Sequence, residues 1–178
     1  IIEYFYPYKY LTDQNWDSVL KEMIPKIRNT PNKKEYHLTL EELIAKLDDT
    51  HASITFSEEK LKYLPIKISQ VDNKAVVSGF YNDSLAKLSG LHLGDFILKI
   101  NELEVEKETD KYLKYVAGSN SNIKIKLTYV KLFKGLEDSI SLTINRNDTI
   151  KTIRAKRYDF NDFNYRNNPK TIKSKSIS

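Results

Sequence analysis

The chain has 178 residues, of which 40 % are hydrophobic and 30 % charged, and its mean hydropathy is −0.54. This balance is typical of soluble globular proteins and excludes a disordered polymer. No apolar run approaches the ~20 residues needed to cross a bilayer, so we expect no transmembrane segment. The chain has no cysteine, which excludes disulfides, thiolate metal sites and a cysteine nucleophile. Its three histidines, at positions 37, 51 and 92, are scattered, so no metal site is expected.

The net charge of +5 is concentrated near the end of the chain. Residues 166–178 carry four basic side chains and no acidic one, which leaves +1 for residues 1–165. The rest of the chain therefore lacks the basic surface of a nucleic-acid-binding protein, and no nucleic-acid partner is expected. The five glycines are too widely spaced for a phosphate-binding loop. We expect no cofactor.

Two helices are predicted in the first third of the chain. Apolar residues between positions 16 and 27 recur three and four positions apart, which indicates an amphipathic helix that Pro25 should bend. A second helix is predicted to open with Thr39 and Glu42, a reciprocal capping pair, and to end near Leu47. A polar elbow at 48–51 and a short strand at 52–56 are expected to follow.

From Tyr63 onward the apolar residues alternate with polar ones, which is typical of β-strands. Strands are predicted at 64–69, 75–77, 96–100 and 103–105, with a closing hairpin formed by 139–145 and 149–157. Helices are predicted at 83–89 and 106–117, each ending at a glycine. Residues 119–134 carry both patterns: their alternation favours a strand, whereas other spacings allow a helix. The fold class is thus α+β: a helical hairpin followed by a small, partly open β-barrel or sandwich with two or three helices.

Residues 85–101, LAKLSGLHLGDFILKIN, are similar to the most recognisable stretch of bacterial PDZ domains. Each position has a physical reason. Gly90 can adopt the left-handed conformation that ends a helix, and Gly94 allows a tight turn. Asp95 is placed to accept hydrogen bonds from the amides of that turn, after which the alternation enters a strand. The similarity implies a PDZ-like domain.

The wider chain, over about residues 3–158, resembles the C-terminal-processing (tail-specific) serine peptidases, particularly those related to the tricorn protease core. The N-terminal helices and the elbow sequence LDDTHA at 47–52 look like the segment that precedes the PDZ domain in that family. The resemblance implies a helical segment at 1–60, a PDZ-like domain at 61–158 and a linker or disordered tail at 159–178. It also implies that residues 119–134 are helical.

The catalytic serine of that family lies in a glycine-rich elbow of a downstream domain. No serine of this sequence is followed by the paired glycines of such an elbow, so we expect the 178-residue chain to be inactive alone. The resemblance makes His51 a candidate general base for a serine supplied by the downstream domain. The alternative is that His51 only bonds to Asp48 or Asp49 and holds the turn.

The resemblance also implies that a polypeptide substrate, or a peptide C-terminus, binds by adding a strand to a sheet edge. By position, the loop and binding strand would contribute Leu64, Pro65, Ile66 and Ile68, and the apposed helix Tyr112, Leu113 and Val116. Pro65 has no amide hydrogen, which weakens carboxylate capture by this loop.

Three functions remain open on the sequence. The first is the non-catalytic N-terminal and PDZ region of a serine peptidase, which binds or gates substrates for a downstream peptidase domain. The second is a stand-alone PDZ-type adaptor without any associated protease. The third is a structural spacer with a closed groove. The family resemblance implies an extracytoplasmic location, in the periplasm or cell envelope.

Overall fold

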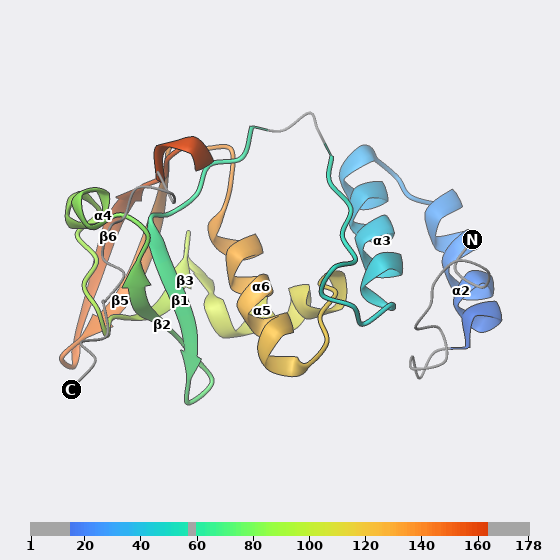
Figure 1. Ribbon diagram of the computed structural model, residues 1–178, viewed down its shortest axis with the longest axis horizontal. Coiled ribbons are helices and arrows are strands. Elements are labelled where there is room, and N and C mark those ends of the chain that lie inside the picture. The colour runs from blue at the N-terminus through green and yellow to red at the C-terminus, as the bar shows by residue number, and fades with distance from the viewer. Residues whose placement is uncertain (1–14, 57–59, 164–178) are drawn as a thin grey trace, which may run out of the picture.

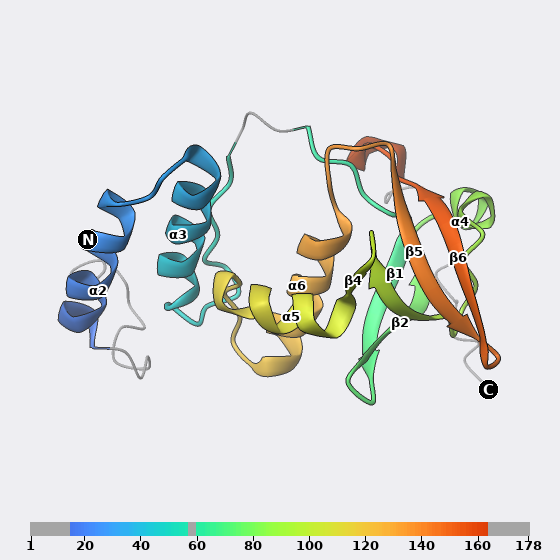
Figure 2. The same cartoon turned by 180° about the vertical axis from the view of Figure 1, so that it is seen from behind.

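The computed structural model describes residues 15–56 and 60–163, and it has the predicted α+β class. Two helices, α2 (Trp16–Arg28) and α3 (Lys33–Ala45), lie at one end of the molecule, and the β-sheet lies at the other (Figure 1). Helices α5 (Val105–Tyr112) and α6 (Ser121–Phe133) lie between them, as the view from behind also shows (Figure 2). The predicted tail lies outside the described residues from position 164 on.

One antiparallel sheet organises the second half of the chain, in the order β1-β2-β3-β5-β6, with the short β4 paired to β3. Its strands are β1 (Ile66–Val71), β2 (Lys74–Phe80), β3 (Phe96–Ile100), β4 (Leu103–Glu104), β5 (Ser139–Arg146) and β6 (Thr149–Lys156). We call these strands, with α5, α6 and the short α4 (Asp83–Ser89), the sheet unit. The strand β1 is an edge of the sheet.

Tight turns join the hairpins of this sheet. At Asp72–Asn73, between β1 and β2, both residues have positive φ, 48° and 61°. The same holds at Asn147–Asp148, between β5 and β6, with φ of 49° and 59°. Two-residue turns of this hand match the twist of antiparallel strands, and Asn and Asp tolerate them best. Both turns confirm the sequence prediction.

The main hydrophobic core belongs to the sheet unit. Side chains from β1, β2, β3, β5 and β6 pack against α5 and α6, with Leu142, Ile144 and Ala155 fully buried. No residue of α2 or α3 belongs to this cluster. The helices bury a separate small group that includes Val19, Met23, Ala45 and Leu47. The helical hairpin therefore has its own core.

Helix α3 begins earlier than the sequence predicted. Asn32 caps it, because its side chain accepts a hydrogen bond from the Glu35 amide at 2.9 Å. The predicted capping pair, Thr39 and Glu42, lies inside the helix, and the Thr39 hydroxyl donates to the Glu35 carbonyl. The predicted capping role is therefore wrong: Thr39 forms the bond to the preceding turn that threonine commonly makes within helices.

Two further boundaries differ from the prediction. Residues 52–56 have no ladder partner and are not a strand. The helix predicted over 106–117 ends at Tyr112, and a 3₁₀ turn, η2 (Leu113–Tyr115), follows it. Val116 is extended, with φ of −123° and ψ of 118°. By contrast α6, capped by Asn120, confirms the helix that the family resemblance implied for residues 119–134.

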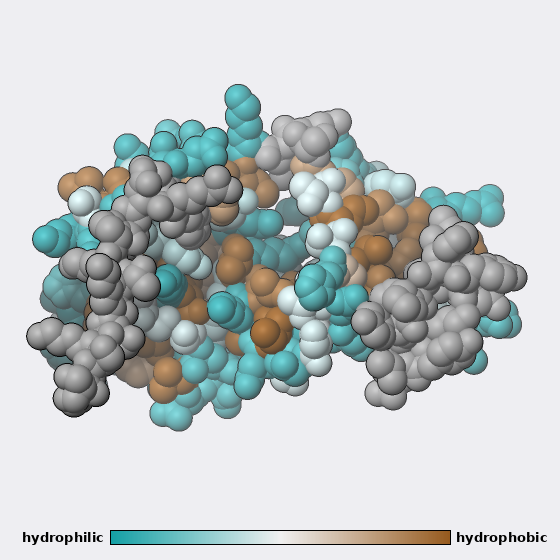
Figure 3. All heavy atoms as spheres, viewed as in Figure 1, coloured by the Kyte–Doolittle hydropathy of each residue, from teal (hydrophilic) through white to brown (hydrophobic). Residues whose placement is uncertain are grey.

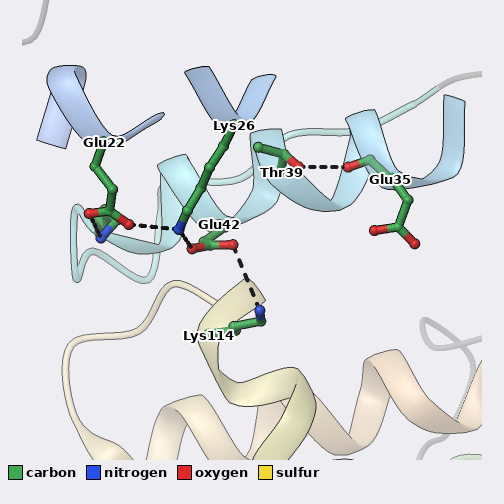
Figure 4. Close-up of polar contacts among 7 residues, drawn as sticks. Glu22, Lys26, Glu35, Thr39, Glu42 and Lys114 are labelled. Carbon is green, nitrogen blue, oxygen red and sulfur yellow. Dashed lines mark hydrogen bonds and ion pairs between the residues drawn. The ribbon is translucent and has the colours of Figure 1, made fainter. Parts of the chain in front are cut away.

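Ion pairs connect the helical hairpin to the sheet unit (Figure 4). Lys26 of α2 contacts Glu22 at 2.7 Å and Glu42 of α3 at 2.8 Å. Glu42 also faces Lys114 of η2, with 3.9 Å between the charged atoms. A second link joins Glu41 of α3 to Lys131 of α6. In the two contacts that leave the helical hairpin, Glu41 and Glu42 of α3 supply the acids, and Lys131 of α6 and Lys114 of η2 supply the lysines.

Candidate functional site

The elbow after α3 is tied to the start of α6. Asp48 has a φ of 51° and pairs with Lys124. The Thr50 hydroxyl lies 2.6 Å from the Ser119 hydroxyl and accepts a hydrogen bond from the Ser119 amide at 3.1 Å. These contacts join residues about 70 positions apart in the sequence. They fix the elbow against the sheet unit and so fix the position of the next residue, His51.

His51 is held by Asp49 on one side and open on the other. The Asp49 Oδ1 atom accepts from the His51 amide at 2.9 Å and lies 3.2 Å from Nδ1 of the ring. The side chain is 97 % exposed, and Nε2 has no hydrogen-bond partner among the residues that the structure describes. A carboxylate on one ring nitrogen and an open second nitrogen is the arrangement that a histidine base requires. The same contact also holds the turn, so both sequence-based readings keep a structural basis.

The loop and strand predicted to bind peptide lie together. Leu64, Pro65 and Ile66 are buried, and Ile68 packs against the core. The second half of β1 is exposed, with 47 % of Val71 accessible. An edge strand with exposed side chains can accept a further strand.

The amides of this loop are largely used within the fold. The Lys62 amide donates to the Gly135 carbonyl at 2.8 Å, and the Tyr63 amide donates to the Tyr158 carbonyl at 2.9 Å. Pro65 has no amide hydrogen, and its carbonyl accepts from Tyr81 at 3.0 Å. These three positions therefore offer no amide for a carboxylate.

The other predicted binding residues lie elsewhere. Tyr112 ends α5, Leu113 belongs to η2, and Val116 is buried beyond that turn. The turn η2 packs against α3, whereas α6 packs against β1. Leu64 to Ile68 thus lie together at the start of β1, whereas Tyr112 and Leu113 lie at the end of α5 and in η2.

A large cleft separates the helical hairpin from the sheet unit. Its volume is about 1510 Å³, and the space-filling view shows the hollow between the two parts (Figure 3). One wall comes from α3 and the extended residues 52–56, where the rings of His37 and Phe56 stack at 3.5 Å. The opposite wall includes Tyr63, Leu132 and Phe160.

Arg157 also lines the cleft, and sequence reasoning did not single it out. The residue is almost fully buried, and among residues 15–56 and 60–163 its guanidinium donates to backbone carbonyls only. Burial lowers the pKa of Arg157. The sequence signal was weak, because Arg157 follows a predicted strand and resembles an ordinary strand-end cation. The extended segment 52–56, predicted as a strand, contributes a wall instead.

Two classes of site are not found in the part of the chain that the structure describes. No group of three or more metal-ligating side chains comes together over residues 15–56 and 60–163. In the same ranges, no helix is long and apolar enough to cross a membrane.

The arrangement of these elements has counterparts among solved proteins. No protein-family model matches the chain, and no curated protein matches it in sequence. Solved structures do match. CPAF complexed with lactacystin shares 18 % identity with a TM-score of 0.63, over 86 % of this chain and 31 % of CPAF. Mature CPAF gives a TM-score of 0.62 at 19 % identity, over 84 % of this chain and 30 % of CPAF. The photosystem II D1 C-terminal processing protease gives a TM-score of 0.41 at 14 % identity, over 84 % of this chain and 39 % of that protease.

The likeness to CPAF is one of fold, and it reaches beyond the sheet unit. Residues 61–158 make up 98 of the 178 positions, so a match over 86 % of the chain must include N-terminal residues as well. The chain spans about a third of the length of CPAF.

Proposed function

We propose that this chain is the non-catalytic N-terminal and PDZ-like region of a serine peptidase, and that it binds or gates polypeptide substrates. The observation that carries this proposal is the fold shared with CPAF across 86 % of the chain. The nucleophile belongs to a catalytic domain outside these residues, which contain no glycine-rich serine elbow. The organisation that fits this role is a helical segment at 1–60, a PDZ-like domain at 61–158 and a linker beyond it. The peptidase acts in the periplasm or cell envelope.

Substrate binds in this proposal by strand addition along β1. Two observations support β1 as the strand that accepts the peptide: it lies at an edge of the sheet, and the side chains of its second half are exposed. Leu64, Pro65, Ile66 and Ile68 shape the entry to that edge. Tyr112, Leu113 and Val116 act indirectly, through the turn that packs on α3.

His51 serves as the general base in the assembled peptidase. Asp49 on Nδ1 and an open Nε2 support this role, because a base must present one ring nitrogen to the nucleophile while the other is held. The elbow contacts from Asp48 and Thr50 keep the ring in place relative to the sheet unit.

The test is casein degradation by the full-length protein with His51→Ala, compared with His92→Ala as a control at another exposed histidine. The proposal predicts loss of at least about 10³-fold in kcat for His51→Ala and no change for the control. Equal activity in both variants would remove His51 as the base. A gene that ends without a serine elbow would instead favour a stand-alone binding module.

A further inference from the structure

The cleft is lined by a buried cation, Arg157, that makes no ion pair with a described carboxylate. Arg157 is 6 % exposed, and its Nε donates to the Phe133 carbonyl at 2.9 Å. Its Nη1 donates to the carbonyls of Glu137 and Ser139, both at 3.4 Å. Among the described residues, Nη2 has no hydrogen-bond partner, and no carboxylate lies within ion-pair distance of the guanidinium. Because arginine stays protonated, its charge is compensated at hydrogen-bond distance by neutral carbonyls, with the Glu137 carboxylate acting on it from farther away.

The chain makes room for this guanidinium at Gly135. A Cβ atom at that position would lie 2.9 Å from Nη1 and 3.2 Å from Nη2 of Arg157. The absence of a side chain therefore lets the guanidinium lie against the backbone of Gly135, which also lines the cleft.

The charges around the cleft complement an anion. Its lining contains six basic side chains and four acidic ones. Two of the acids, Glu41 and Glu108, already pair with lysines. The other two are Asp159, whose charge acts on Lys62, and Asp162. Lys34 and Lys60 line the cleft and have no ion-pair partner among the described residues.

We propose that Arg157 binds a carboxylate of a polypeptide segment that occupies this cleft, with an apolar or aromatic neighbour against Phe56, Tyr63 and Phe160. The proposal rests on the proposed function and names the substrate chemistry that the chain selects. The amides of Lys62 and Tyr63 already donate to backbone carbonyls, and Pro65 has no amide hydrogen. Arg157 therefore explains how a carboxylate is held without amides of this loop. A guanidinium can supply two donors to a carboxylate where the loop cannot.

The test is a titration of the 178-residue chain with three labelled decapeptides, followed by fluorescence anisotropy. One ends in Phe with a free carboxylate, one is its amide, and one is the amide with a Glu beside the Phe. The first and third arms distinguish a chain terminus from an acidic side chain as the source of the carboxylate. We expect at least one carboxylate peptide to bind at least tenfold more tightly than the neutral amide.

The variants separate binding from folding. Arg157→Gln should weaken the carboxylate peptide at least tenfold, whereas Arg154→Gln, a strand cation outside the cleft lining, should leave its affinity unchanged. If Arg157→Gln unfolds, Lys60→Gln tests the same site, with an expected loss of about threefold at low salt. In the wild-type chain, the Arg157 Nε resonance should shift on addition of peptide, which a purely structural arginine would not show.

Two outcomes would overturn the proposal in different ways. Equal binding of the carboxylate and neutral peptides, or an unmoved Arg157 resonance, would exclude the carboxylate site but leave polypeptide binding in place. No binding of any peptide at millimolar concentration would contradict the proposed function as well.

Discussion

The pair between Asp95 and Arg146 is expected to contribute strongly to the stability of the sheet unit. Asp95 has a side chain only 1 % exposed, and its carboxylate accepts from Nε and Nη2 of Arg146, both at 2.7 Å. It also accepts from the His92 amide at 2.8 Å, as the sequence predicted for the turn around Gly94. The pair therefore fixes the turn that leads into β3 against the end of β5.

Asp95→Asn keeps the shape of this side chain but removes its charge and one acceptor oxygen. Breaking one partner of a buried ion pair costs about 3–5 kcal/mol. Because the Arg146 side chain is 21 % exposed, it can regain contact with water, and we expect the lower end, about 3 kcal/mol. The measurement is urea unfolding followed by far-ultraviolet circular dichroism. Asp83→Asn, at an exposed position in the first turn of α4, is the control and should change the free energy of unfolding by less than about 0.5 kcal/mol. A loss below about 1 kcal/mol for Asp95→Asn would refute the reasoning.

Three further predictions concern pH, an ion pair and backbone conformation. Burial alone would raise the pKa of Asp95, but the hydrogen bonds and charges of Arg146 and the His92 amide outweigh it, and the pKa is lowered below 3.8. The ionised Asp95 carboxylate therefore stabilises the fold above pH 3.8, and this stabilisation is lost as the pH falls through the folded-state pKa. Below pH 4, the free energy of unfolding should therefore fall less steeply with pH in Asp95→Asn than in the wild type. Lys131→Glu replaces the ion pair with Glu41 by a repulsion between two carboxylates, and it should weaken the docking of α3 on α6. The midpoint of urea unfolding, followed by the fluorescence of the single tryptophan, Trp16, should fall. Gly90→Ala should cost about 1 kcal/mol in thermal unfolding, because φ is 73° although no atom would clash.

Each of these predictions has a result that contradicts it. Identical acid transitions in wild type and Asp95→Asn would show that the lowered pKa is not linked to folding. An unchanged Trp16 midpoint in Lys131→Glu would mean that the ion pairs do not hold the helical hairpin. A Gly90→Ala variant as stable as wild type would show that alanine accepts this left-handed position without cost.

The sequence predicted best where local chemistry decides the structure. The turns at Asp72–Asn73 and Asn147–Asp148 follow from residues that tolerate positive φ, and the end of α4 follows from Gly90 in the left-handed conformation. Such signals depend on a few neighbouring residues. They do not require knowledge of what packs against them.

Local patterns alone were not enough where distant contacts decide. The alternation in residues 119–134 favoured a strand, and only the family resemblance implied the helix that the structure shows, capped by Asn120 and with Tyr129 and Phe133 buried in the core. Tyr112 and Leu113 fall on a helix in the sequence pattern, but the helix ends there and the next turn packs on α3. The cleft site was invisible for the same reason, because it joins residues from α3 to Arg157 that only the folded chain brings together.

Hydrogen–deuterium exchange of the 178-residue chain, with and without a casein-derived peptide, tests the account most directly. The same samples report cleavage by mass spectrometry. We predict slower exchange in β1, over residues 66–71, while the peptide stays intact. Cleavage of the peptide by this chain, or protection that spares β1, would contradict the claim that the chain binds substrate at this edge and leaves catalysis to another domain.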